Sequence, residues 1–226
     1  MKLQPRQELK HEISYGDYLA LRHRLLAVMP HDPYAGADGI YTVHSLYFDN
    51  FADAALREKM DGKPQREKFR IRYYRGDPSF MHLEKKCKIN GVTMKYMAEI
   101  TEAEVRALLT GDTAWMKASE RGLVRELYAK MQTQLLRPRT AVEYIREPLM
   151  FEPGHIRITF DQQISAGPAD ERFLVPHTSI PANHRGTVIL EIKYDHYLPA
   201  HIAALLQMGD RTRQSYSKYE AARTLF

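Results

Sequence analysis

The segment EKFRIRYYRG at residues 67–76 constrains the fold most strongly, because its charges recur at every second position. Lys68, Arg70 and Arg72 alternate with three apolar or aromatic residues. Side chains of a β-strand point to opposite faces with a period of two. The segment therefore predicts a strand with one cationic and one apolar face. In an antiparallel sheet such a charged face commonly meets water, so one strand of this kind does not by itself indicate a ligand.

Other segments repeat this division between a charged and an apolar face. It recurs in RQELKHEI (6–13), FMHLEKKCK (80–88), AVEYIRE (141–147), HIRITFD (155–161) and VILEIKYD (188–195). In the second of these, Lys85 interrupts the apolar face. YTVHSLYFDN (41–50) and GVTMKYMAEI (91–100) are further strand candidates with a less regular division. Short alternating segments with turns between them predict a largely antiparallel sheet or barrel.

Helices are predicted between these strands. The first begins at Ser14, a favourable N-cap, and continues to residue 29. The segment 101–111 opens with a capping box formed by Thr101 and Glu104. Three more helices are expected at 114–136, 198–209 and 217–226. Because strands and helices follow each other without a regular βαβ rhythm, the fold class is expected to be α+β.

The charged faces of the six most regular strands hold more cations than anions. The cations are Arg6, Lys10, Lys68, Arg70, Arg72, Lys86, Lys88, Arg146, Arg157 and Lys193, and the anions are Glu8, Glu12, Glu84, Asp161, Glu191 and Asp195. An antiparallel barrel of about eight strands with helices packed outside would turn these faces inward and enclose a small ligand. Buried cations need anions to offset their desolvation. We therefore expect a multiply charged anion such as a polyphosphate, together with a metal, because Arg and Lys commonly bind phosphate.

The composition fits one soluble globular domain spanning residues 1–226. Hydrophobic residues make up 44% of the chain and charged residues 27%, and the net charge of +5 is compatible with an anionic partner. Cys87 is the single cysteine, which is typical of a reducing compartment. The sequence contains neither an apolar run of about 20 residues nor the apolar core of a signal peptide. A cytoplasmic location without a membrane span in this chain is the resulting prediction.

The order of eight short segments resembles a known family. ELK, SLYFDN, KFRIRYY, LEKKCK, YIRE, IRITFD, LEIKYD and YSKYE together resemble the VTC domain, the polyphosphate polymerase branch of the CYTH or triphosphate tunnel superfamily. The resemblance extends from about Arg6 to Tyr219. It implies a tunnel-shaped antiparallel barrel that binds ATP and inorganic polyphosphate with a divalent metal, Mn²⁺ or Mg²⁺. It also implies transfer of the terminal phosphoryl group of ATP to a polyphosphate chain.

The resemblance further implies roles for individual residues. The catalytic phosphate-binding positions would be Arg70, Arg72, Lys86, Arg146, Arg157 and Lys218, and Lys10, Tyr144 and Ser217 would bind substrate. Glu191 would be the metal ligand. Glu84 and Lys193 join the substrate-binding set from the charged-face pattern, with Glu84 expected to orient Arg70 rather than to bind metal. Taken singly, the charged residues of this set are also compatible with a surface charge or an ordinary ion pair.

Two other functions remain open from the sequence. The superfamily is marked by E-x-E near the N-terminus, whereas this chain has Glu8, Leu9 and Lys10, which favours the VTC branch over a metal-dependent triphosphatase. A non-catalytic module that binds polyphosphate or inositol phosphates is the other alternative. Nucleic acid is not an expected partner, because there is no aromatic-rich RNP-like strand and no basic tail. The sequence resembles neither the SPX domain nor the membrane helices of eukaryotic VTC subunits, so a separate membrane partner is an open expectation.

Overall fold

The computed structural model of the protein describes residues 7–175, 179–208 and 216–225. The chain forms two compact units, each assembled from segments that are separated in the sequence. Unit 1 comprises residues 1–42, 144–164 and 183–217, and unit 2 comprises residues 43–143, 165–182 and 218–226. The single domain expected at 1–226 stays a prediction.

The strands form an antiparallel sheet. They are β1 (Gln7–Ser14), β2 (Tyr41–Asp49), β3 (Gln65–Tyr74), β4 (Asp77–Ile89), β5 (Val92–Ile100), β6 (Arg137–Phe151), β7 (Ile156–Gly167), β8 (Ile180–Pro181) and β9 (Thr187–Tyr194). Their hydrogen-bonded order is β1-β9-β7-β6-β2-β3-β4-β5, with β8 beside β7. Within the described residues the order begins at β1 and ends at β5. No pairing between these two strands closes the sheet into a barrel there. The predicted antiparallel α+β class is confirmed.

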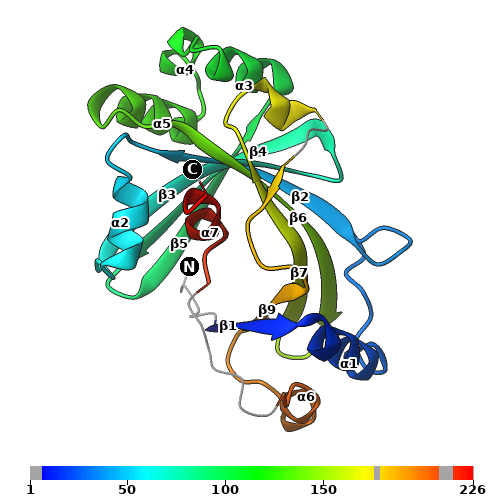
Figure 1. The fold of residues 1–226 in the computed structure, drawn as a ribbon. Coiled ribbons are helices and arrows are strands. Elements are labelled where there is room, and N and C mark those ends of the chain that lie inside the picture. Colours follow the sequence, from blue (N-terminus) through cyan, green and yellow to red (C-terminus); the bar gives the residue numbers. More distant parts are fainter. Residues whose placement is uncertain (1–6, 176–178, 209–215, 226) are drawn as a thin grey trace. The chain divides into compact units, whose positions relative to one another are not determined.

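Seven α-helices accompany these strands in the described part of the chain. They are α1 (Tyr15–Leu26), α2 (Ala54–Met60), α3 (Glu102–Leu109), α4 (Ala114–Lys117), α5 (Gly122–Thr133), α6 (Ala200–Leu205) and α7 (Lys218–Arg223), with a 3₁₀ turn at Glu171–Leu174 (Figure 1). Both predicted N-caps are confirmed: Ser14 and Asp17 form a capping box at α1, and Thr101 and Glu104 form one at α3. None of the helices described has the length and apolar character that a membrane crossing demands.

Some predicted element boundaries were wrong. The helix predicted at 114–136 is two helices, because the backbone of Arg121 is extended at φ −74° and ψ 110°. The Arg121 side chain donates to the Glu99 carbonyl at 2.7 Å and to Ser119 Oγ at 3.2 Å, which fixes the break. Gly122, a weak helix former, follows it. Helix α2 was not predicted, and Arg6, Gly209 and Phe226, which belonged to predicted elements, lie outside the described residues.

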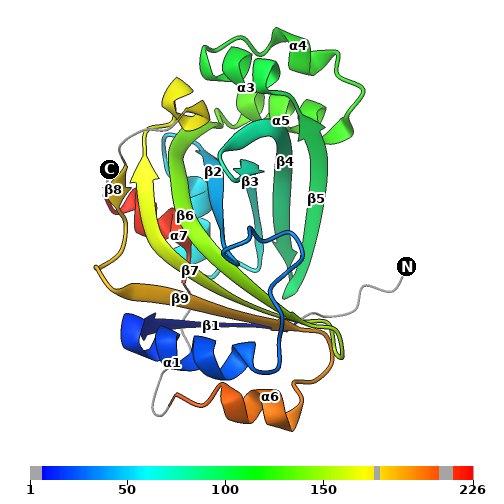
Figure 2. The ribbon, with the colours of Figure 1, turned by 90° about the vertical axis from the view of Figure 1, so that its right-hand side faces the viewer.

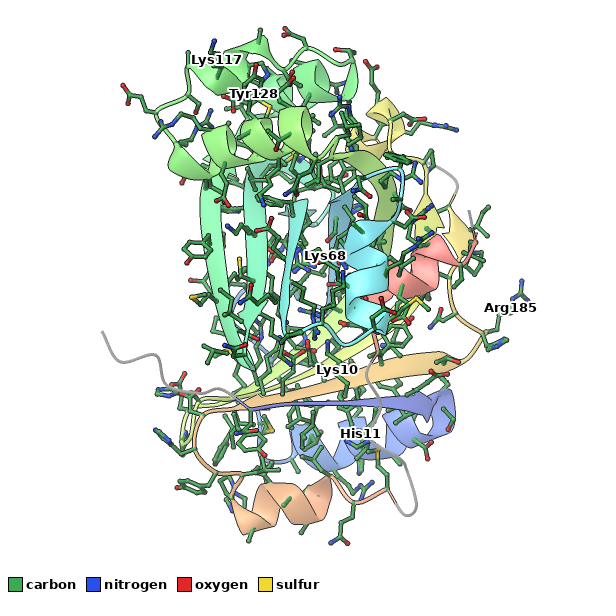
Figure 3. All side chains as sticks on the ribbon, turned by 90° about the vertical axis from the view of Figure 1, so that its left-hand side faces the viewer. Lys10, His11, Lys68, Lys117, Tyr128 and Arg185 are labelled. Carbon is green, nitrogen blue, oxygen red and sulfur yellow. The ribbon has the colours of Figure 1, made fainter. Side chains whose placement is uncertain are left out.

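Unit 1 has its own hydrophobic core. Helix α1 lies beside β1 and β9, and α6 lies beside α1 (Figure 2). Leu21 and Leu25 of α1, Phe160 of β7 and Leu190 of β9 are all fully buried in one cluster. One face of β1 therefore packs against α1 and the other does not. Figure 3 shows His11 on the side of α1 and Lys10 on the opposite side. The polar face of β1 thus points away from this core.

Unit 2 has a second core under α3 and α5. Phe69 and Ile71 of β3 pack with Leu83 of β4, Val105 of α3 and Leu127 of α5, and all five are essentially inaccessible to solvent. The apolar face predicted for residues 67–76 is confirmed. Because strand side chains alternate, the cations of β3 face away from these helices.

Lys85 is the cation that interrupts the apolar face of β4. It forms ion pairs with Glu126 of α5 and with Glu67, the latter at 3.6 Å. Its Nζ also lies 5.7 Å from the centroid of the Phe69 ring. Two carboxylates and an aromatic ring thus accommodate a charge on a face that otherwise packs against helices.

Candidate functional site

Glu191 lies at the centre of a charged cluster in unit 1. Its carboxylate is 3.1 Å from Lys193 Nζ, 3.4 Å from Lys10 Nζ and 3.7 Å from Arg146 Nη2. Lys10 is the direct partner of Glu191 in the β1–β9 register, and it also contacts Glu8 at 2.8 Å. Four of the predicted site residues, Glu191 included, therefore come together, and Glu191 itself is only 6% exposed.

The charges of this cluster stabilise one another. Burial alone would raise the pKa of Glu191, but Glu8, Lys193, Lys10 and Arg146 outweigh it and hold that pKa well below its usual range. For Lys10, burial opposes the charge, yet Glu191 and Glu8 raise its pKa. Burial lowers the pKa of Lys193 even though Glu191 and Glu8 counteract it. At neutral pH Glu191 is therefore a carboxylate and Lys10 an ammonium group.

Arg157 is on the same polar face but has different partners. Its Nη2 donates to Asp32 Oδ2 and to the Tyr41 hydroxyl, both at 2.9 Å. Its Nε is buried, as is the hydroxyl of Thr159 two residues on, and neither atom has a hydrogen-bond partner within the described residues. Thr159 pairs directly with Glu191 in the β7–β9 register. Buried polar atoms of this kind are costly, so this face can accept a polar ligand.

The residues around Glu191 fit a divalent metal only in part. Glu8 and Glu191 supply carboxylate oxygens, which Mg²⁺ and Mn²⁺ accept, and Mg²⁺ commonly uses one or two carboxylates together with substrate phosphates. In the described residues, however, no group of three or more His, Cys, Asp or Glu side chains could hold a metal ion. The surroundings of Glu191 therefore suit a metal that binds together with substrate phosphates better than a metal held by protein ligands alone.

Arg70 is at the centre of the charged face of unit 2. Its Nε donates to Glu84 Oε2 at 2.6 Å, and its Nη1 to the Tyr47 hydroxyl at 3.4 Å. Lys95 contacts the other oxygen of Glu84 at 2.6 Å. Burial would raise the pKa of Glu84, but Arg70, Arg72 and Lys95 lower it to about 2. The expected contact between Glu84 and Arg70 is present.

The neighbouring positions of this face are also cationic. Arg72 is 6% exposed, and its Nε donates to Ser45 Oγ at 2.9 Å. Lys86 is the direct partner of Lys68 in the β3–β4 register and of Lys95 in the β4–β5 register. On the described part of this face, cations outnumber carboxylates, so it favours an anionic ligand. In the Glu191 cluster of unit 1, by contrast, carboxylates accompany the cations.

The remaining predicted residues have less definite surroundings. Tyr144 is 1% exposed and lies under Arg146, whose guanidinium carbon is 5.3 Å from the ring centroid. Lys218 is the first residue of α7, and Ser217 precedes it; both are half-buried. Ser217 belongs to unit 1 and Lys218 to unit 2.

Sequence reasoning missed several partners of the predicted cations. Asp32 lies outside the predicted strands and helices, and nothing in the sequence around it indicated a contact with Arg157. Ser45, Tyr47 and Asp49 do alternate along β2, and all three are buried. That alternation indicates a polar face on β2, but apolar residues on both faces of the strand made the pattern hard to recognise.

Comparison with solved structures shows two proteins that share this fold. A "putative adenylate cyclase" from Vibrio parahaemolyticus is 11% identical, with a TM-score of 0.52 over 97% of this chain and 98% of that chain. A "putative adenylate cyclase" from Bacillus halodurans is also 11% identical, with a TM-score of 0.50 over 90% of this chain and 86% of that chain. No curated protein matched the sequence. The chain thus shares its fold with these two proteins.

A family model assigns the chain more closely. The model of the VTC domain matches residues 5–226. The chain belongs to the VTC domain family, as the order of its eight motifs predicted.

Proposed function

We propose that the protein binds ATP and inorganic polyphosphate and transfers the terminal phosphoryl group of ATP to a polyphosphate chain. The proposal combines membership of the VTC family with the cationic face of unit 2. That face is the observation that carries it, because a phosphate chain supplies the negative charge that the cations lack. Members of VTC and CYTH-like families are typically phosphotransferases or triphosphatases, and phosphoryl transfer fits both.

Phosphoryl transfer requires alignment and positive charge rather than a covalent catalytic group. In unit 2, Arg70, Arg72 and Lys86 would contact phosphate oxygens, while Glu84 orients Arg70. In unit 1, Arg146, Arg157, Lys10 and Lys193 would do the same, and Arg157 Nε has a hydrogen bond to offer. Tyr144, Ser217 and Lys218 would complete the phosphate contacts. The nucleophile would be a terminal phosphate oxygen of the acceptor, so no side-chain nucleophile is needed.

A divalent metal, Mg²⁺ or Mn²⁺, would supply charge neutralisation between phosphate oxygens when bound. Glu191 would hold it, with Glu8 as the neighbouring carboxylate. Binding requires that Lys10 and Lys193 give up part of their contact with Glu191. Phosphates that enter with the metal would take over as partners of these lysines.

Incubation of the purified protein with ATP and Mn²⁺ or Mg²⁺ tests the proposal. Gel analysis of the products should show polyphosphate longer than the substrate. Free phosphate without polymer would indicate a triphosphatase instead. A nucleotide or polyphosphate that binds without turnover under either metal would contradict catalysis.

A non-catalytic polyphosphate or inositol phosphate binder is the second candidate. Two observations at Glu191 favour it. The carboxylate already has three cationic partners, and the described residues contain no cluster of three or more potential metal ligands. In a pure binder, Glu191→Ala would leave anion affinity nearly unchanged. The predicted cytoplasmic location and a separate membrane partner remain proposals, which localisation and pull-down experiments can test.

A further inference from the structure

The ammonium group of Lys68 lies over two adjacent aromatic rings on the charged face of unit 2. Its Nζ is 4.4 Å from the centroid of the Tyr47 ring in β2 and 4.1 Å from that of Tyr219 in α7. Figure 3 labels Lys68 on this unit. The side chain is half-buried, and no ion pair links it to a carboxylate of the described residues. Cation–π contacts stabilise the ammonium group without neutralising its charge.

A row of three lysines crosses the sheet at this position. Lys68 of β3 is paired with Lys86 of β4, and Lys86 is paired with Lys95 of β5. Like charges placed directly opposite each other destabilise a sheet. Glu84 accompanies the Lys95 end of the row, where its carboxylate lies 2.6 Å from Lys95 Nζ. The Lys68 end of the row is therefore where an anion would relieve the most repulsion.

Helix α7 holds the Tyr219 ring of this arrangement in place. The Tyr219 hydroxyl donates to Asp49 Oδ2 at 2.7 Å. Asp49 also accepts from the backbone N–H of Ala55 at 2.9 Å and of Leu56 at 3.2 Å in the first turn of α2. Two ion pairs, Lys59 with Glu220 and Arg223 with Asp53, join α7 to α2 and to the residue before it.

We propose that Lys68 is a further phosphate-binding residue of unit 2, and that Tyr219 is the positioning residue that holds its ammonium group. The inference rests on the proposed function, because it adds a residue to the same anion-binding face. The two rings restrict the ammonium group to one place, and its remaining N–H donors suit the oxygens of a phosphate. Lys68 lies two residues from Arg70 along β3, on the same face, so one phosphate chain can contact both.

Proton uptake offers a readout that a purely structural lysine would not give. Burial, together with Arg70 and Lys86, lowers the pKa of Lys68 to about 7, against the opposing influence of Tyr47 and Asp49. A bound phosphate favours the charged form, so binding near pH 7 should load a proton onto Lys68. Tyr47 also titrates there: burial would raise its pKa, but Arg70, Lys68 and Arg72 lower it to about 7. The ring of Tyr219 in α7 also faces Lys68.

Calorimetric titration with inorganic tripolyphosphate tests Lys68 directly. Lys68→Met should bind about tenfold more weakly than the wild type, because a charge-assisted contact is lost. Lys68→Arg should keep most of the affinity. Lys117→Met is the matched control, because Lys117 is exposed in α4 of the same unit, away from Lys68 (Figure 3). The affinity of this variant for tripolyphosphate should equal that of the wild type.

Titrations in buffers of different ionisation enthalpy at pH 7 give the number of protons taken up. Lys68→Arg should take up fewer protons than the wild type, because arginine is always charged. The proton uptake that remains in Lys68→Arg is attributed to Tyr47. It should disappear in the double variant Lys68→Arg, Tyr47→Phe. Equal uptake by wild type and Lys68→Arg would overturn the proposal even if Lys68→Met failed to fold.

The positioning role of Tyr219 needs its own pair of variants. Tyr219→Leu removes the ring and should weaken tripolyphosphate binding several-fold, whereas Tyr219→Phe keeps the ring and should restore most of the affinity. Equal affinity in Tyr219→Leu and wild type would overturn that role. A wild-type protein that binds no tripolyphosphate would instead overturn the proposed function, and wild-type affinity in Lys68→Met would overturn only the inference about Lys68.

Discussion

Arg146 and Asp161 form a pair with two hydrogen bonds in unit 1. Arg146 Nε donates to Oδ1 of Asp161 at 2.6 Å, and Nη2 donates to Oδ2 at 2.8 Å. Asp161 is fully buried and Arg146 only 8% exposed. This geometry fixes the guanidinium group so that Nη2 also lies 3.7 Å from Glu191. Asp161 therefore determines where a proposed phosphate-binding residue points.

Replacement of Asp161 by asparagine should destabilise the protein. The variant leaves the buried Arg146 charge without its carboxylate, and breaking a buried pair costs about 3–5 kcal/mol. The free energy of unfolding in urea measures this loss. Glu12→Gln, an exposed change in β1, is the control and should alter stability by less than about 0.5 kcal/mol. An Asp161→Asn variant as stable as the wild type would contradict the stabilising role of the pair.

Glu191→Gln should separate turnover from binding. The variant removes the proposed metal ligand, so polymer synthesis from ATP should fall about 100-fold or more. Tripolyphosphate binding without metal should be retained or become tighter, because Lys10 and Lys193 lose a competing anion. Circular dichroism confirms folding, and Glu12→Gln again serves as the control. Undiminished turnover would remove the metal role of Glu191.

Arg70→Ala should weaken the binding of tripolyphosphate. The loss of a charge-assisted contact is worth about 2 kcal/mol, or roughly 30-fold in affinity. Arg75→Ala removes an equal charge from an exposed position just after β3 and should have little effect. If both variants bind as the wild type does, Arg70 is not part of an anion site.

Glu84 should make stability depend on acid pH. Its pKa in the folded protein is lowered to about 2 by Arg70, Arg72 and Lys95, which outweigh burial. A lowered pKa contributes stability above the unfolded value of about 4.3, and this contribution is lost as pH falls through about 2. The stability advantage of wild type over Glu84→Gln should therefore shrink by about 3 kcal/mol at most across that interval. Urea unfolding at several acid pH values measures it, and a constant difference would contradict the assignment.

The fold class and the strand faces were predictable because they depend on local periodicity. The segment around Ile71 shows why: alternation with a period of two places Phe69 and Ile71 together whatever the rest of the chain does. The two capping boxes, at Ser14 and Thr101, are equally local. The break at Arg121 was not predictable, because it depends on contacts with Glu99 and Glu104 that the chain makes only after folding.

The cations of the candidate site were predictable, but apart from the contact of Glu84 with Arg70 most of their partners were not. The pattern of β7 indicated Arg157 on a charged face, yet its contact with Asp32 joins residues 125 positions apart. Likewise, the pattern placed Lys68 on a charged strand face but did not indicate its contact with the ring of Tyr219, which lies 151 positions further along the chain. Tertiary contacts of this range have no periodic signal in the sequence.

The pairing of β1 with β9 has a consequence for biosynthesis. Gln7 is aligned with Tyr194, and every other residue of β1 has its partner in β9. A ribosome releases the first strand long before its partner exists, so the N-terminal edge emerges with its backbone amides unmatched. Such distant pairing slows folding and leaves newly made chains open to association. Exposure of this strand during translation should thus last at least until β9 (Thr187–Tyr194) has been synthesised.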